Sequence, residues 1–224
     1  MLVFGPMRRS PSKKKGIVFD LDGTLVDSLS TTFDAFNDAI VKSGAKAKTP
    51  SEIMAYFGTG ESQIFAKILG DQYASAAFAH AREYLNRNLK RVPLHSGVGD
   101  LMEKLKSSSI PISIFTGRSW ETTRLILEHH GWLDRFITVI AHDHVTEPKP
   151  SAEGLLLALS RMRLEPEEVF FVGDSPVDIL AAKRAGSSSI AALWDLLASR
   201  EALESCQPEY WANQPMDIWD ILQE

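Results

Sequence analysis

Residues 16–27, "GIVFDLDGTLVD", run from an apolar segment directly into three carboxylates. The apolar run at 17–19 is typical of a short buried strand, and the Asp-Leu-Asp-Gly that follows is typical of a loop. Asp20 and Asp22 are one residue apart, so an extended backbone turns both side chains to the same side. Two carboxylates this close repel each other unless a divalent cation lies between them or one carries a proton. The stretch therefore predicts a strand that ends at a site with paired carboxylates.

The rest of the chain repeats an alternation of apolar runs and helical patterns. Further strands are expected at 110–115, 136–140, 169–172 and 189–193. Helices are expected at 98–106, 119–130, 151–162, 176–185 and 216–222. This alternation predicts an α/β fold, a Rossmann-like parallel sheet with helices on both faces. Ligands of such sheets bind beyond the carboxyl ends of the strands.

Between the first strand and the remainder of the sheet the pattern is helical throughout. Helices are expected at 31–42, 51–57, 62–69 and 72–89. We therefore predict a disordered leader at 1–15, a core domain formed by 16–27 and 96–224, and an all-helical cap domain at 28–95. A cap inserted beside the mouth of a sheet is well placed to act as a lid.

Composition narrows the class of protein. The chain has 224 residues, 44% of them hydrophobic, and no apolar run near the roughly 20 residues of a membrane helix. We therefore expect a soluble protein without a membrane partner. The formal net charge of −5 argues against a nucleic-acid partner. The single cysteine, Cys206, forms no internal disulfide, which is consistent with the reducing cytoplasm.

A calcium-binding loop is one alternative explanation of the Asp-x-Asp-Gly pattern. An EF-hand loop needs Gly at its sixth position and Glu at its twelfth. Counted from Asp20, Gly23 falls at position four and Thr31 at position twelve. The pattern therefore does not fit an EF-hand.

The stretch "DLDGTLVDS" at 20–28 resembles the first signature of the haloacid dehalogenase superfamily. The later signatures follow in order: Thr116-Gly117 after an apolar run, Lys149-Pro150 before a helix, and "GDSPVDI" at 173–179 after another run. The resemblance covers the chain from residue 16 to residue 193. It implies a Rossmann-like core, a helical cap and hydrolase chemistry.

The resemblance also implies roles for the acidic residues. Asp20 resembles the nucleophile that attacks phosphorus and forms an aspartyl-phosphate. Asp22 resembles the general acid that protonates the leaving oxygen and then the base that activates water. A Mg²⁺ ion would be held by Asp20, by the backbone carbonyl of Asp22 and by Asp174. Asp178 would not bind the metal directly; it would position a metal-bound water or Lys149.

Other matched positions would bind the substrate. Thr116 offers a hydroxyl, Gly117 a backbone N–H beside a helix start, and Lys149 a positive charge for the transferring phosphoryl oxygens. The cap loop "YFGTGES" at 56–62 resembles the specificity loop of the family, and its possible specificity residues are Phe57, Gly58, Thr59 and Gly60. Arg118 stands where the phosphoglycolate phosphatase branch commonly has Asn. Arg118 is either a contact for a second anionic group of the substrate or a solvated or helix-capping residue.

These features favour a Mg²⁺-dependent phosphatase of the phosphoglycolate phosphatase-like branch, acting on a small phosphorylated metabolite. A dehalogenase of this superfamily would lack Asp22, because halide needs no proton donor. One alternative is a β-phosphoglucomutase-like mutase, although the His it would carry shortly after the first signature is absent from 28–36. The other is a phospho-ligand-binding module with weak catalysis.

Overall fold

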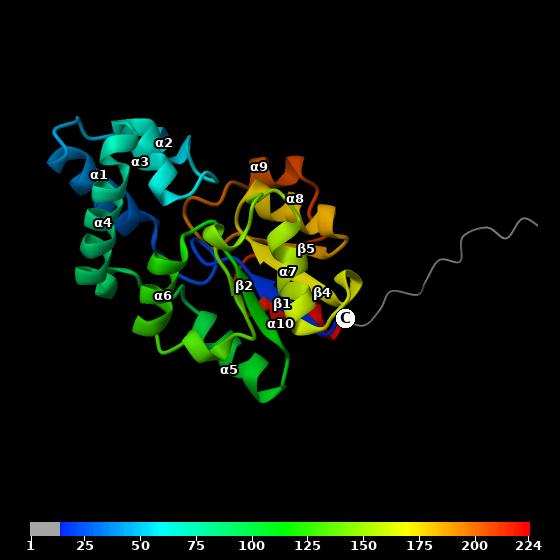
Figure 1. Cartoon of the computed structure of the whole chain (residues 1–224). Coiled ribbons are helices and arrows are strands. Elements are labelled where there is room, and N and C mark those ends of the chain that lie inside the picture. The colour runs from blue at the N-terminus through cyan, green and yellow to red at the C-terminus, as the bar shows by residue number, and fades with distance from the viewer. Residues whose placement is uncertain (1–13) are drawn as a thin grey trace, which may run out of the picture.

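A six-stranded parallel sheet forms the centre of the larger part of the molecule in this computed structural model, which describes residues 14–224 (Figure 1). The strands are β1 (Gly16–Phe19), β2 (Ile112–Phe115), β3 (Val139–Ile140), β4 (Val169–Gly173), β5 (Ser188–Ala192) and β6 (Tyr210–Ala212). They lie in the order β3-β2-β1-β4-β5-β6. The predicted α/β fold with a parallel sheet is confirmed, and β6 is an added edge strand.

Helices cover both faces of the sheet because successive strand residues point to opposite sides. Ile17 and Phe19 of β1 pack in one cluster with α5 (Val98–Ser107), α6 (Trp120–His129) and α10 (Asp217–Gln223). Val18 packs in a second cluster with α7 (Glu153–Met162) and α8 (Pro176–Ala185). Every residue of β1 is therefore buried, as in other two-sided parallel sheets.

Four helices form a separate group, seen at the upper left of Figure 1. They are α1 (Leu29–Lys42), α2 (Pro50–Met54), α3 (Glu61–Leu69) and α4 (Asp71–Arg87). They have a hydrophobic cluster of their own, in which the rings of Phe36 and Phe65 stack with centroids 4.7 Å apart. All four coincide with predicted helices to within a few residues. The exact boundaries of the cap domain at 28–95 stay a prediction.

The remaining elements are short. They are α9 (Arg200–Ser205) and the 3-10 helices η1 (Leu89–Arg91), η2 (Leu133–Arg135), η3 (His142–His144) and η4 (Pro166–Glu168). In the part of the chain that the structure describes, no helix is both long and apolar enough to cross a membrane.

Most of the predicted leader lies outside the described residues. Lys14 and Lys15, which the prediction included in the leader, lie against the core. Lys14 Nζ donates to Ser188 Oγ at 2.6 Å, and the Lys15 backbone N–H donates to the Glu168 carbonyl at 2.7 Å.

The contact between α7 and β2 yields a test of the packing. Gly154 is the second residue of α7, and a Cβ added there would lie 2.2 Å from Cε2 of the buried Phe115 ring. We expect Gly154→Ala to destabilise the protein by about 1–3 kcal/mol in urea unfolding. Gly99, the second residue of α5, is the matched control, because a Cβ there meets no heavy atom within 4 Å. Gly99→Ala is expected to keep or slightly raise stability. Equal stability of the two variants would contradict the described packing.

Candidate active site

The candidate site lies where the strand order of the sheet reverses. β1 and β4 are neighbours at the centre, and the chain builds outward from them to β2 and β3 on one side and to β5 and β6 on the other. Asp20 directly follows β1, and Asp174 directly follows β4. The Asp20 backbone N–H donates to the Val172 carbonyl at 2.8 Å, which holds the end of β1 against β4. Parallel pairing thus brings two carboxylates that are far apart in the sequence to the carboxyl ends of neighbouring strands.

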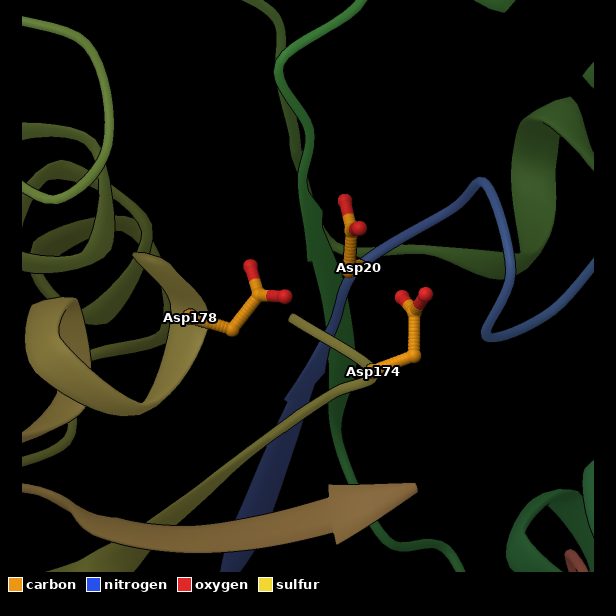
Figure 2. A group of neighbouring side chains, drawn as sticks. All are labelled: Asp20, Asp174 and Asp178. Atoms are coloured by element: carbon orange, nitrogen blue, oxygen red, sulfur yellow. The ribbon is translucent and has the colours of Figure 1, made fainter. Parts of the chain in front are cut away.

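A third carboxylate joins them from α8. Oxygen atoms of Asp20, Asp174 and Asp178 all lie within 4.8 Å of one another, and Figure 2 shows the three side chains around a common space. Ser175 is the N-cap of α8, and Pro176 is its first residue. Asp178 Oδ2 accepts from the backbone N–H of Ser175 at 3.1 Å and from its hydroxyl at 2.7 Å. These bonds fix the Asp178 carboxylate at the start of the helix.

Lys149 is the cation at this acidic cluster. Its Nζ donates to Asp20 Oδ1 at 2.8 Å and to Asp178 Oδ1 at 2.7 Å, and the side chain is 5% exposed. The ammonium also lies over the rings of Phe115 and Phe171, about 5 Å from each centroid. Burial acts to lower the pKa of Lys149, but the charges of Asp178 and Asp20 raise it above its ordinary value. Lys149 therefore carries its charge at neutral pH.

The cluster holds more negative charge than Lys149 neutralises. Burial raises the pKa of Asp20 to about 7; Lys149 opposes this shift, whereas the charge of Asp178 adds to it. Burial and the charges of Asp20 and Asp178 raise the pKa of Asp174 well above its ordinary value. Three carboxylates beside one lysine leave negative charge uncompensated. A divalent cation could offset this charge, because it prefers oxygen ligands of this kind. The donor set therefore fits Mg²⁺.

Gly23 allows the Asp174 side chain to approach the first motif. A Cβ at Gly23 would lie 2.4 Å from Asp174 Oδ2, and the residue has φ +75°, which favours glycine. The neighbouring Thr24 hydroxyl donates to Asp174 Oδ1 at 3.1 Å. The sequence motif thus provides both the space for Asp174 and one of its hydrogen bonds.

Asp22 faces a different partner. Arg118 donates to both of its oxygens, from Nη2 to Oδ1 at 2.6 Å and from Nε to Oδ2 at 3.0 Å, and the Ser28 hydroxyl also donates to Oδ1. Burial acts to raise the pKa of Asp22, but the charge and hydrogen bonds of Arg118, with the bond from Ser28, lower it. Asp22 is therefore ionised at neutral pH in this arrangement.

Glu61, which lies in the predicted specificity loop but was given no role of its own, joins the cap to the core. It starts α3, and its Oε1 lies 3.3 Å from Arg118 Nη1. Glu61 Oε2 accepts from the backbone N–H of Ser119 at 3.0 Å, from the Ser119 hydroxyl at 2.6 Å and from the Thr122 hydroxyl at 2.6 Å. A carboxylate at the N-terminus of α6 is favoured by the helix dipole. An acidic residue after a glycine-rich loop was visible in the sequence, but its partners were not.

The second signature precedes a helix as predicted, but the N-terminus of that helix already has a partner. α6 begins at Trp120, one residue after the predicted start, and Glu61 accepts from the Ser119 backbone N–H there. Thr116 Oγ1 accepts from the backbone N–H of Arg118 at 3.1 Å. The donors left for a phosphate at this turn are the Thr116 hydroxyl and the Gly117 N–H.

All the site residues predicted from the sequence line one cavity of about 630 Å³. Its lining includes Asp20, Asp22, Phe57, Gly58, Thr59, Gly60, Thr116, Gly117, Arg118, Lys149, Asp174 and Asp178. Leu197 and Ser199, from the segment after β5, also line it and were not predicted. The structure therefore brings the predicted residues together, while their individual roles stay predictions.

Comparisons with known proteins agree with this arrangement. The family described as haloacid dehalogenase-like hydrolase matches residues 17–192. A phosphoglycolate phosphatase of Xanthomonas campestris pv. campestris (strain 8004) is 29% identical over 210 residues, covering 92% of this chain and 95% of the relative. A phosphoglycolate phosphatase of Aquifex aeolicus (strain VF5) is 29% identical over 207 residues, with the same shares covered. The crystal structure of a predicted phosphoglycolate phosphatase from Haemophilus somnus 129PT has a TM-score of 0.82 at 24% identity, covering 95% of this chain and 99% of that one.

Proposed function

Because the chain belongs to the haloacid dehalogenase-like hydrolase family, we propose that it is a phosphatase that hydrolyses a small phosphate monoester at the Asp20 site. The observation that carries the proposal is the buried Asp20, held by Lys149 at 2.8 Å within a cluster of three carboxylates. The names of the relatives support a phosphatase.

Asp20 is the nucleophile in this proposal. Lys149 holds Oδ1, which leaves Oδ2 to attack phosphorus. The new O–P bond forms as the bond from phosphorus to the ester oxygen breaks, and the leaving oxygen takes a proton from Asp22. Water then attacks phosphorus, gives a proton to Asp22 and releases phosphate from Asp20. Dividing the displacement into two steps lowers the barrier of each.

Asp22 fits the second half of this cycle better than the first. Its bonds to Arg118 keep it ionised, which suits the base that activates water. The acid step needs a proton on Asp22, and the same bonds oppose that protonation. We therefore assign the first proton transfer to a state in which the contact between Asp22 and Arg118 is weakened.

The phosphate group is bound by donors from two segments. Thr116 and Gly117 offer a hydroxyl and a backbone N–H after β2, and the Lys149 ammonium supplies charge. Fixed donors of this kind stabilise the charge that develops on the phosphoryl oxygens in the transition state.

A Mg²⁺ ion would be held by Asp20, Asp174 and the backbone carbonyl of Asp22. When bound, it supplies the positive charge that offsets the carboxylates and the phosphoryl oxygens. Asp178 is not assigned to the metal, because Lys149 donates to its Oδ1 and the Ser175 hydroxyl donates to its Oδ2. Its role is to position Lys149.

Metal removal tests this assignment. We expect exhaustive chelation to lower phosphate release by at least about a hundredfold and added Mg²⁺ to restore it, because the acidic cluster then regains its counter-charge. Asp174→Asn is expected to raise the Mg²⁺ concentration needed for half-maximal activity. Calorimetric titration with Mg²⁺ provides a readout that does not depend on turnover. Full activity after chelation would refute the metal requirement.

A panel of phosphorylated metabolites, assayed for released phosphate, tests the phosphatase function itself. Sustained release of phosphate from at least one ester supports it. Binding of phosphate esters without turnover in the presence of Mg²⁺ would instead identify a binding module.

A further inference from the structure

We propose that the active-site cavity selects phosphate esters with a neutral, apolar leaving group, an inference that rests on the proposed phosphatase function. The cavity of about 630 Å³ is far larger than a phosphate needs and lies in the range of sites that hold larger organic ligands. The acidic cluster and Lys149 lie at the carboxyl ends of the strands, whereas Glu61 and Arg118 line the cavity where the cap meets the core. The remaining space belongs to the leaving group.

Apolar side chains line that remaining space. The cap contributes four of them: Phe36 of α1, Met54 of α2, Phe57 of the loop after α2, and Ile64 of α3. Val177 of α8 and Leu197 after β5 line the opposite, core side. The lining therefore presents apolar side chains from both parts of the molecule, together with the polar residues Thr32, Thr59 and Ser199.

Four of these side chains stay open to solvent: Met54 and Val177 are each 37% exposed, Phe57 is 41% exposed and Leu197 is 52% exposed. Exposed apolar area clustered around one cavity is typical of a binding surface. Covering it with an apolar group is favourable because that area leaves water.

The charges of the lining oppose an anionic leaving group. Among the residues that the structure describes, Lys149 and Arg118 are the cations that line the cavity. Lys149 is engaged by Asp20 and Asp178, and Arg118 is engaged by Asp22 and Glu61. In this arrangement a carboxylate on the substrate meets no cation without a partner, and at Arg118 it approaches the carboxylates of Asp22 and Glu61. When the contact with Asp22 weakens for the first proton transfer, Glu61 remains as a partner of Arg118. We therefore do not expect Arg118 to bind a second anionic group of the substrate.

A series of n-alkyl phosphates tests the inference on the full-length chain with Mg²⁺. Ethyl, butyl and hexyl alcohols have similar acidity, so the leaving-group chemistry stays nearly constant along the series. We expect kcat/KM to rise roughly two- to fourfold for each added methylene that enters the cavity. Phosphoglycolate, whose leaving group carries a carboxylate, is expected at least about tenfold below butyl phosphate. A flat series, or a preference for phosphoglycolate over butyl phosphate, would overturn the inference.

Two matched variants localise the effect. Leu197 and Ile137 are each 52% exposed, but only Leu197 lines the cavity. Leu197→Ser is expected to lower the ratio of kcat/KM for hexyl over ethyl phosphate by about threefold or more. Ile137→Ser is expected to leave that ratio unchanged. An equal effect of the two variants would show that the preference does not arise in this cavity.

Binding of alkylphosphonates separates this inference from the phosphatase function, because their phosphorus–carbon bond is not hydrolysed by the proposed chemistry. Tighter calorimetric binding of hexylphosphonate than of ethylphosphonate is expected. That result without hydrolysis of any ester would contradict the phosphatase function and support the apolar site. Hydrolysis with no dependence on chain length in rate or binding would contradict the apolar site alone.

Discussion

Asp20→Asn is expected to lower kcat by at least about a thousandfold, because the amide cannot serve as the nucleophile of the proposed mechanism. Asp20 is buried, and its carboxylate directly contacts Lys149 at the centre of the acidic cluster. The substitution is nearly isosteric, so the fold is expected to persist. Phosphate release with Mg²⁺ and the best ester of the panel measures the effect.

Asp27→Asn is the matched control for this variant. Asp27 belongs to the same stretch of sequence but is exposed and does not line the cavity. Its substitution is expected to leave kcat within about twofold of the wild type, as for other surface changes away from a site. If Asp20→Asn kept more than a tenth of the activity, Asp20 would not be the nucleophile.

Lys149→Met is expected to lower both activity and stability. Loss of the ammonium removes a donor that we propose stabilises the transition state, so kcat is expected to fall by about a hundredfold or more. It also leaves Asp20 and Asp178 buried without their cation, which costs about 3 kcal/mol or more in the free energy of unfolding. Phosphate release and urea unfolding measure the two effects separately.

Two further variants make this prediction specific. Lys183→Met removes an exposed lysine from α8 and is expected to change neither quantity appreciably. The double variant Lys149→Met with Asp178→Asn is expected to recover part of the lost stability, because one uncompensated charge is gone, but not the activity. Stability of Lys149→Met equal to that of Lys183→Met would contradict the described ion pairs.

The sequence predicted the central strands because they are buried on both faces. Apolar runs such as 169–172 need no alternation and stand out between polar turns, and β4 was observed there with one more residue. β6 covers only Tyr210–Ala212 and lies at the sheet edge, where two of its residues are partly exposed. Three residues give no measurable periodicity, so no strand was predicted at this place.

The same contrast holds at the site. Asp20, Thr116, Lys149 and Asp174 could be placed together because each lies in a signature at the end of a strand or the start of a helix. The pairing of Arg118 with Asp22 and Glu61 depends on side-chain directions across three segments, between positions 96 and 57 residues apart. No local pattern encodes such a contact. The lowered pKa of Asp22 and the position of Leu197 in the cavity lining likewise could be seen only in the folded structure.

The most direct test of the central claim is detection of the phosphorylated enzyme. The Asp22→Asn variant lacks the proposed base that activates water, and p-nitrophenyl phosphate needs no proton on its leaving group. The variant and p-nitrophenyl phosphate are mixed with Mg²⁺ and quenched in acid, and the digested protein is analysed by mass spectrometry. We expect one phosphoryl group on Asp20, which hydroxylamine removes. Release of nitrophenol with Asp20 unmodified, or with the phosphoryl group on another residue, would contradict nucleophilic attack by Asp20.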